Sequence, residues 1–323
     1  MGTHDAPPVP VDEATLLRDA GLPETATRGA DPPASVVARV VDQLPLTSRF
    51  SLAERITPVQ REFFDRHGYL VFDQVAKKHE VEMILSEIDR IQESWIAEGR
   101  THVHGIPLFV GRDPDAQPFI QRFTFTSMFS PSLRAFVLDD RFEPVRQMVG
   151  ADARVGHDEM DGVVFNRYVK SSGSAYPKLG WHTDGLRDLA YFRKPEQMFN
   201  VGMHFDRITE ADGGLRIIPG SHNQGMWDMC FRKLYFFDHK PDPAEIMVET
   251  WPGDLTVHDG RTWHRVQGSS KSGWDSLRRS MYVPYQTGPA IKRTDDSPTP
   301  IYHRIGQAQR WWRNRRSGSA EQG

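Results

Sequence analysis

From residue 160 onward the chain consists of short segments rich in β-branched and aromatic residues, separated by Gly, Pro, Asp and Ser. In order they read GVVFNRYV, MFNVGMHFDRI, GGLRIIPGSH, IMVETW, DLTVHD, HRVQG and LRRSMYVPYQ. Many short strands with such punctuation are typical of a β-sandwich or barrel. Because a helical first half precedes them, we predict a mainly β fold with flanking helices, and a double-sheet jelly roll is the preferred arrangement.

The helices of the first half are indicated by capping residues and by apolar spacing. In TPVQREFFDRHGYLVF, Thr57 can cap a helix, Gln60 can complete a capping box, and Gly68 ends the helix before a strand over YLVF. Apolar residues at spacings of three and four predict further helices over about 78–98 and 131–148.

The ends of the chain differ in composition from this body. Residues 1–48 contain the proline-rich patches APPVPV and ADPPAS, so we expect a flexible or loosely packed N-terminal arm. Residues 49–290 form the predicted jelly-roll domain with its helices and loops. Residues 291–323 are a C-terminal tail in which QRWWRNRRSGS mixes basic and aromatic residues, and a frayed tail is the simplest interpretation.

Composition limits the class of protein and its partners. The chain has 323 residues, 38% of them hydrophobic, and a formal net charge of −3, which is typical of a soluble protein that does not bind nucleic acid by bulk attraction. Neither a membrane span nor a signal peptide is evident. Cys230 is the single cysteine, which excludes cysteine-based zinc sites. We expect a cytoplasmic monomer or homodimer that acts on a small molecule.

The stretch GWHTDG indicates a metal site. On an extended strand, His182 and Asp184 project from the same face. A third ligand is available in PGDLTVHDGRTWHRVQG, as His258 or His264. Two histidines and a carboxylate match the facial triad of non-haem Fe(II) oxygenases, which leaves three coordination positions open. The same set also suits Zn²⁺ in a hydrolase or isomerase.

The stretch LRRSMYVPY indicates what could fill the open positions. A 2-oxo acid can chelate two of them and leave one for O2, and the distal carboxylate of 2-oxoglutarate would need a buried arginine. On a strand Arg278 and Arg279 face opposite ways. Ser280 shares a face with Arg278 and could bind the same carboxylate, so we predict Arg278 as the anchor and keep Arg279 as the alternative.

Taken together, GWHTDG, DGGLRIIPGSH, GDLTVHDGRTWHRV and LRRSMYVPY resemble the phytanoyl-CoA dioxygenase family of Fe(II)/2-oxoglutarate oxygenases, over about residues 55–288. The resemblance implies a double-stranded β-helix (jelly-roll) core that uses Fe(II), 2-oxoglutarate and O2. It implies His264, and not His258, as the partner of His182 and Asp184 in binding iron. It also implies that Arg278, with Ser280, binds 2-oxoglutarate.

The resemblance further bears on the reaction and on co-substrate contacts. Halogenating relatives carry a small residue where Asp184 stands, so hydroxylation or a related oxidation is favoured. Gln121 and Asn166 fall where family members place polar groups near the co-substrate.

Three residues are weaker candidates for substrate binding. His204 follows the GWHTDG loop and either faces the pocket or is a buried, hydrogen-bonded histidine. Trp227 and Phe231 belong to MWDMCFRKLYFFDHK, which either forms a lid over an apolar substrate or supplies the buried stripe of a short helix.

These patterns predict a dioxygenase that oxidises an unactivated C–H bond of a small, partly apolar molecule, such as a natural-product intermediate, with release of succinate and CO2. The alternatives are a CoA-thioester α-hydroxylase of the same family, a metal-dependent hydrolase or isomerase, and a non-catalytic binding protein on the same barrel.

Overall fold

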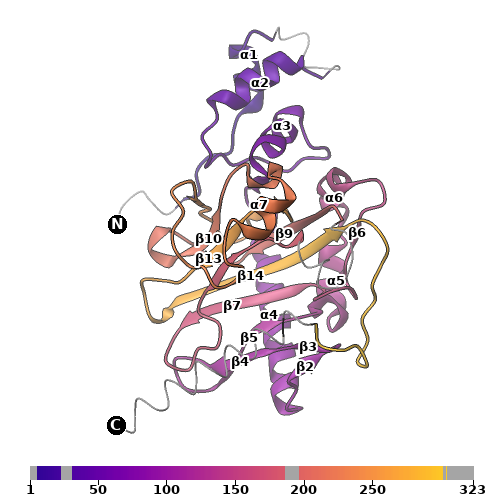
Figure 1. Cartoon of the computed structure of the whole chain (residues 1–323), viewed down its shortest axis with the longest axis vertical. Helices are drawn as coiled ribbons and strands as arrows, with labels where there is room; N and C mark the ends of the chain where they lie inside the picture. Colours follow the sequence, from indigo (N-terminus) through magenta and orange to yellow (C-terminus); the bar gives the residue numbers. More distant parts are fainter. Residues whose placement is uncertain (1–5, 23–30, 186–195, 301–302, 304–323) are drawn as a thin grey trace.

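The computed structural model describes residues 6–22, 31–185, 196–300 and 303. Its centre is a jelly roll of two antiparallel sheets, as the sequence predicts (Figure 1). The major sheet has the order β1-β12-β9-β14-β7-β5-β4, with β6 also paired to β14. Its strands are β1 (Tyr69–Phe72), β4 (Phe109–Arg112), β5 (Pro118–Phe123), β6 (Arg154–Val155), β7 (Val164–Lys170), β9 (Met198–His204), β12 (Leu255–Asp259) and β14 (Gly273–Gln286).

The minor sheet has the order β11-β10-β13-β8 and contains the two strands in which His182 and His264 lie. Its strands are β8 (Leu179–His182), β10 (Gly214–Ile217), β11 (Ile246–Met247) and β13 (His264–Gln267). A small hairpin, β2 (His102–Val103) with β3 (Ile106–Pro107), lies apart from both sheets.

Side chains alternate between the two faces of the major sheet. Val201, Met203 and Met281 belong to the hydrophobic core on the outer face, together with residues of the helices. Their neighbours along the same strands, such as Asn200 and Tyr282, line a cavity on the inner face. This period of two is what a sheet with one face on a core requires, and it brings polar side chains into the barrel.

The helices form where capping residues and apolar spacing predict them. Thr57 and Gln60 make the expected capping box at the start of α3 (Pro58–His67), and Gly68 ends it in the left-handed conformation at φ 79°. Helix α4 (Lys78–Ala97) buries the stripe that contains Ile84 and Trp95. The other helices are α1 (Glu13–Asp19), α2 (Ala34–Gln43), α5 (Pro131–Val137), α6 (Glu143–Val149) and α7 (Met226–Phe231).

The single helix expected over about 131–148 is wrong, because the structure has α5 and α6 there. Asp139 follows α5, and its side chain accepts a hydrogen bond from the backbone N–H of Arg141, which favours a new turn. Pro144 lies in the first turn of α6, where its missing N–H has no consequence; inside one long helix it would remove a hydrogen bond.

The described part of the N-terminal arm contacts the body. Helix α2 buries Val36, Val37, Val40 and Val41, and it packs on α3. Together α1 and α2 form one end of the molecule in Figure 1. Residues 23–30 of the arm and 304–323 of the tail, with its basic and aromatic residues, lie outside the described residues. Among the described helices, none combines the length and the apolar character needed to cross a membrane.

Candidate metal centre

The two stretches that predict a metal site lie side by side in the minor sheet. Strands β8 and β13 pair so that His182 is the cross-strand partner of His264. Asp184 follows two residues after His182. One ligand atom from each of the three side chains lies within 4.8 Å of the other two, and all three residues are buried.

Hydrogen bonds hold the three side chains in orientations that suit a metal ion. Nδ1 of His182 lies 2.9 Å from the carbonyl of Gly180, and Nδ1 of His264 lies 3.0 Å from the carbonyl of Thr262. A ring that donates from Nδ1 keeps the Nε2 lone pair for a metal. Burial, and then the neighbouring His182, lowers the pKa of His264 well below its usual value, so this ring is neutral and able to coordinate.

The carboxylate of Asp184 is also held in place. Its Oδ2 atom accepts a hydrogen bond of 2.7 Å from the side-chain amide of Asn200, on β9. Two neutral imidazoles and one carboxylate, oriented by outer hydrogen bonds, make a donor set that fits Fe(II) and leaves coordination positions open.

Arg278 and Arg279 face opposite ways, as the alternation on β14 predicts. The Arg278 side chain is 4% exposed and enters the barrel, where its guanidinium carbon lies 5.4 Å from the ring centroid of Tyr168. It donates to the carbonyls of Gln267 and Pro177, while its Nε has no hydrogen-bond partner. Arg279 instead binds both carboxylate oxygens of Asp206.

Arg278 is therefore a buried cation that lacks an acidic partner, since no carboxylate in the described part of the chain pairs with it. Burial lowers its pKa to about 10, which still leaves the guanidinium charged at neutral pH. A buried charge of this kind is stabilised when an anionic ligand binds it.

Two cavities inside the barrel share part of their lining. The larger is lined by the three candidate metal ligands together with Arg122, Asp161 and Asn166. The smaller is lined by Arg278, Arg279, Ser280, His204 and Thr250, among others. Tyr168, Val266 and Tyr282 line both cavities, so the metal triad and the buried guanidinium lie in adjoining spaces.

The phytanoyl-CoA dioxygenase (PhyH) family model matches residues 64–272. The chain belongs to the phytanoyl-CoA dioxygenase family. It is a non-haem iron, 2-oxoglutarate-dependent dioxygenase, and its cofactors are Fe(II), 2-oxoglutarate and O2. Membership of this family favours the oxygenase over the hydrolase, isomerase and binding-protein alternatives.

Individual relatives are distant. A probable alpha-ketoglutarate-dependent hypophosphite dioxygenase of Stutzerimonas stutzeri is 22% identical over 242 residues, which cover 72% of this chain and 78% of the relative. Among solved structures, the epimerase SnoN from nogalamycin biosynthesis is 17% identical, with a TM-score of 0.53 over 73% of this chain and 85% of that one. EvdO2 from Micromonospora carbonacea var. aurantiaca is 19% identical, with a TM-score of 0.51 over 77% and 97%. These likenesses show the fold.

The remaining predicted residues of this dioxygenase lie in different places. Asn166 lines the larger cavity, and Ser280 and His204 line the smaller one. His204 also hydrogen-bonds Thr256 through Nε2 at 3.0 Å, and burial lowers its pKa to about 3, so it is neutral. His204 therefore lines a cavity and is also a buried, hydrogen-bonded residue, so its position agrees with both interpretations.

Gln121 is not among the residues that line either cavity. Its side-chain oxygen accepts hydrogen bonds from the backbone N–H groups of Ala175 and Tyr176, at 2.6 and 3.0 Å. Its amide donates to the hydroxyl of Ser174 at 2.9 Å. All of these contacts hold the loop between β7 and β8, so we do not propose Gln121 as a co-substrate ligand.

The aromatic segment after residue 225 differs from its expected burial. Trp227 and Phe231 are 75% and 65% exposed, so the interpretation of a buried helical stripe is wrong. Neither residue lines the larger cavity, which contains the candidate metal ligands. The contact with the site comes a few residues later. The Phe236 ring lies 5.0 Å from the His182 ring, and the Tyr235 hydroxyl donates to the carbonyl of Thr183.

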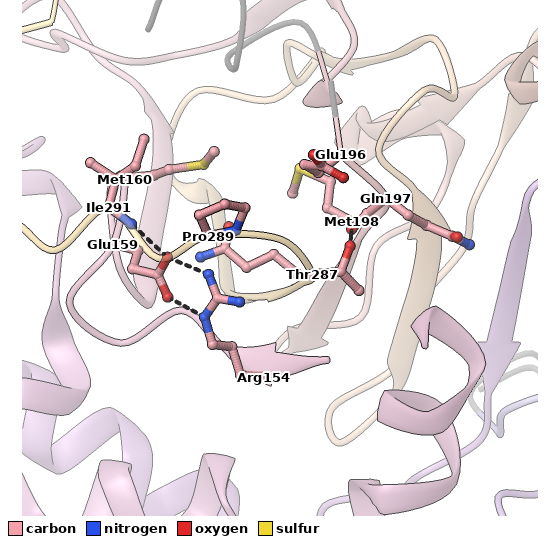
Figure 2. A pocket seen from close by; sticks show the side chains of 10 residues that line it. Arg154, Glu159, Met160, Glu196, Gln197, Met198, Thr287, Pro289 and Ile291 are labelled. Atoms are coloured by element: carbon pink, nitrogen blue, oxygen red, sulfur yellow. Dashed lines mark hydrogen bonds and ion pairs between the residues drawn. The ribbon is translucent and has the colours of Figure 1, made fainter. Parts of the chain in front are cut away.

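A third hollow shares one lining residue, Met160, with the cavity that contains the candidate metal ligands. Figure 2 shows Arg154 and Glu159 joined by two short hydrogen bonds on one side of it, with Met198 and Thr287 opposite. The hollow could not be foreseen, because its residues come from four separate stretches of the sequence.

Proposed function

We propose that the enzyme couples oxidative decarboxylation of 2-oxoglutarate to oxidation of an unactivated C–H bond in a small, partly apolar molecule, such as a natural-product intermediate. We assign His182, Asp184 and His264 as the iron ligands. The supporting observation is that their donor atoms converge to within 4.8 Å at the wall of a cavity that is also lined by apolar and aromatic side chains.

When bound, iron and 2-oxoglutarate supply the oxidising chemistry, in which O2 is consumed, 2-oxoglutarate becomes succinate and CO2, and the substrate is oxidised, most simply by gaining a hydroxyl. The protein supplies positions and surroundings. Arg278 binds the distal carboxylate of 2-oxoglutarate, because it is a buried guanidinium with no acidic partner among the described residues. Ser280 lies two residues further along the same strand face and contributes a hydroxyl to the same cavity.

The lining of the larger cavity favours a small substrate that has both apolar and polar parts. Most of the lining side chains are apolar or aromatic: Met160, Val164, Tyr168, Tyr176, Leu179, Val266, Tyr282 and Pro284. The polar side is formed by Asn166 and by the ion pair between Arg122 and Asp161, 2.7 Å apart. Such a pair can orient a hydroxyl, carbonyl or carboxylate while the apolar wall excludes water.

The test is substrate-stimulated succinate release. The enzyme would be incubated with Fe(II), 2-oxoglutarate and O2 and a panel of secondary metabolites, CoA thioesters, amino acids and hypophosphite. We expect stimulation by a partly apolar metabolite, together with incorporation of an oxygen atom or loss of hydrogen from it. Stimulation confined to CoA thioesters would instead establish the α-hydroxylase alternative. Absence of oxygen-dependent succinate formation with every panel member would refute the proposal.

A further inference from the structure

His258 is a fully buried histidine inside the barrel whose side chain has no hydrogen-bond partner. It belongs to β12, where it is the cross-strand partner of Asn200 on β9. Its residue exposure is 0%, and neither Nδ1 nor Nε2 makes a hydrogen bond. A buried imidazole in this state destabilises a fold relative to an apolar ring of similar size. Packing alone therefore does not account for a histidine at this position.

The ring lies next to the candidate metal ligands. Its Nε2 is 3.6 Å from Oδ2 of Asp184, and its centroid is 4.5 Å from that of His264. The same Oδ2 accepts the 2.7 Å hydrogen bond from Asn200. A side-chain amide nitrogen and an imidazole nitrogen, from neighbouring strands, thus approach one carboxylate oxygen.

A role as a fourth metal ligand fits less well. His258 is not part of the group of donor atoms that lie within 4.8 Å of one another. A fourth protein ligand would also leave too few positions for a chelating oxo acid and O2 around a six-coordinate ion.

A hydrogen bond from His258 to Asp184 requires only a small movement. The 3.6 Å between Nε2 of His258 and Oδ2 of Asp184 is longer than a hydrogen bond, but a shift of a few tenths of an ångström would bring the two atoms within hydrogen-bond distance.

We propose that His258 is a positioning residue: with Asn200, it donates a hydrogen bond to Oδ2 of Asp184, the oxygen that also lies 3.7 Å from Nε2 of His264, and so fixes the orientation of this carboxylate for the metal. The inference rests on the assignment of Asp184 as an iron ligand. Hydrogen bonds to a ligating carboxylate fix its orientation and raise the affinity of the site.

The experiment compares His258→Phe, which keeps a ring but removes the N–H, with His258→Gln, whose amide nitrogen can occupy the place of Nε2. Dissociation constants for Fe(II) would be measured anaerobically by calorimetry, and the melting temperature of each metal-free protein by scanning calorimetry. We expect His258→Phe to weaken Fe(II) binding roughly 10- to 100-fold while its metal-free melting temperature is unchanged or higher. His258→Gln should recover most of the affinity.

Two further variants separate the possible failures. His222→Phe is a matched control, because His222 is buried outside the site and hydrogen-bonds the carbonyl of Asp65; it should lower the melting temperature without changing the Fe(II) affinity. His182→Ala should abolish Fe(II) binding. If it does, and His258→Phe binds Fe(II) as the wild type does or fails to fold without metal, only the His258 inference is wrong. If wild type and His182→Ala bind Fe(II) alike or not at all, the ligand assignment and the inference both fail.

Discussion

Replacement of Arg278 tests how the enzyme holds 2-oxoglutarate. In the structure the guanidinium is buried, stacks on Tyr168 and has an Nε–H without a partner. If it binds the distal carboxylate, Arg278→Ala leaves a desolvated carboxylate with no counter-charge. Loss of one partner of a buried, hydrogen-bonded charge pair costs about 2–5 kcal/mol. At about 1.4 kcal/mol per factor of ten, the dissociation constant for 2-oxoglutarate should rise roughly 30- to 4,000-fold.

Arg279→Ala is the matched control, because it removes the same side chain from the next residue of the strand. Arg279 also borders the smaller cavity, but its guanidinium pairs with Asp206, and both of these side chains are partly exposed. Such a pair contributes about 1 kcal/mol or less to stability. We therefore expect a small loss of stability and a dissociation constant for 2-oxoglutarate within about threefold of wild type. Arg278→Lys should lie between the two, since an ammonium keeps the charge but loses the planar, two-pronged contact.

The assay is anaerobic calorimetric titration of 2-oxoglutarate into protein loaded with Fe(II). The affinity for Fe(II) alone is measured in parallel and should be equal in all variants, because neither arginine contacts the metal ligands. The reasoning is refuted if Arg278→Ala binds 2-oxoglutarate within threefold of wild type. If only Arg279→Ala weakened the binding of 2-oxoglutarate strongly, Arg279 would be the residue that binds its distal carboxylate.

Three further predictions concern the ligands and the fold. His182→Ala should abolish iron-dependent succinate formation with an unchanged circular dichroism spectrum, and normal turnover would mean that the ligands are misassigned. Gly68→Ala should destabilise the protein by about 2–3 kcal/mol or more, as measured by urea unfolding. The reason is that φ of Gly68 is 79° and that a Cβ at this position would lie 2.4 Å from Nδ1 of His222. A stability equal to wild type would contradict this packing. Trp227→Ser and Phe231→Ser should change stability by no more than about 0.5 kcal/mol in the same assay, since both side chains are exposed, and a loss above 2 kcal/mol would indicate that they are buried in solution.

The fold, the closeness of His182 to Asp184 and the opposite facing of Arg278 and Arg279 could be predicted from short-range patterns. A strand repeats every two residues, which separates Arg278 from Arg279 on β14; Asp184 lies two residues beyond the end of β8, and its side chain still converges on that of His182. The punctuated second half of the chain likewise indicates a jelly roll. The break between α5 and α6 was also encoded locally, in Asp139 and Pro144, but the apolar spacing across it suggested one helix.

Other parts of the site depend on register between distant strands, which a single sequence does not contain. The approach of Asn200 and His258 to Asp184 arises from the pairing of β9 with β12 and from where β8 ends. Gln121 lies on β5, a strand that we do not predict from the sequence, and its side chain contacts the loop between β7 and β8. Of the two interpretations of Trp227 and Phe231, the buried helical stripe is wrong, because apolar spacing along a short helix does not show whether another element covers it.

The most direct test of the central claim is the visible absorption of the protein after anaerobic addition of Fe(II) and 2-oxoglutarate. The account predicts a weak charge-transfer band that saturates at one equivalent of each per chain and is absent in His264→Ala. No band in the wild-type protein, or an undiminished band in His264→Ala, would contradict it.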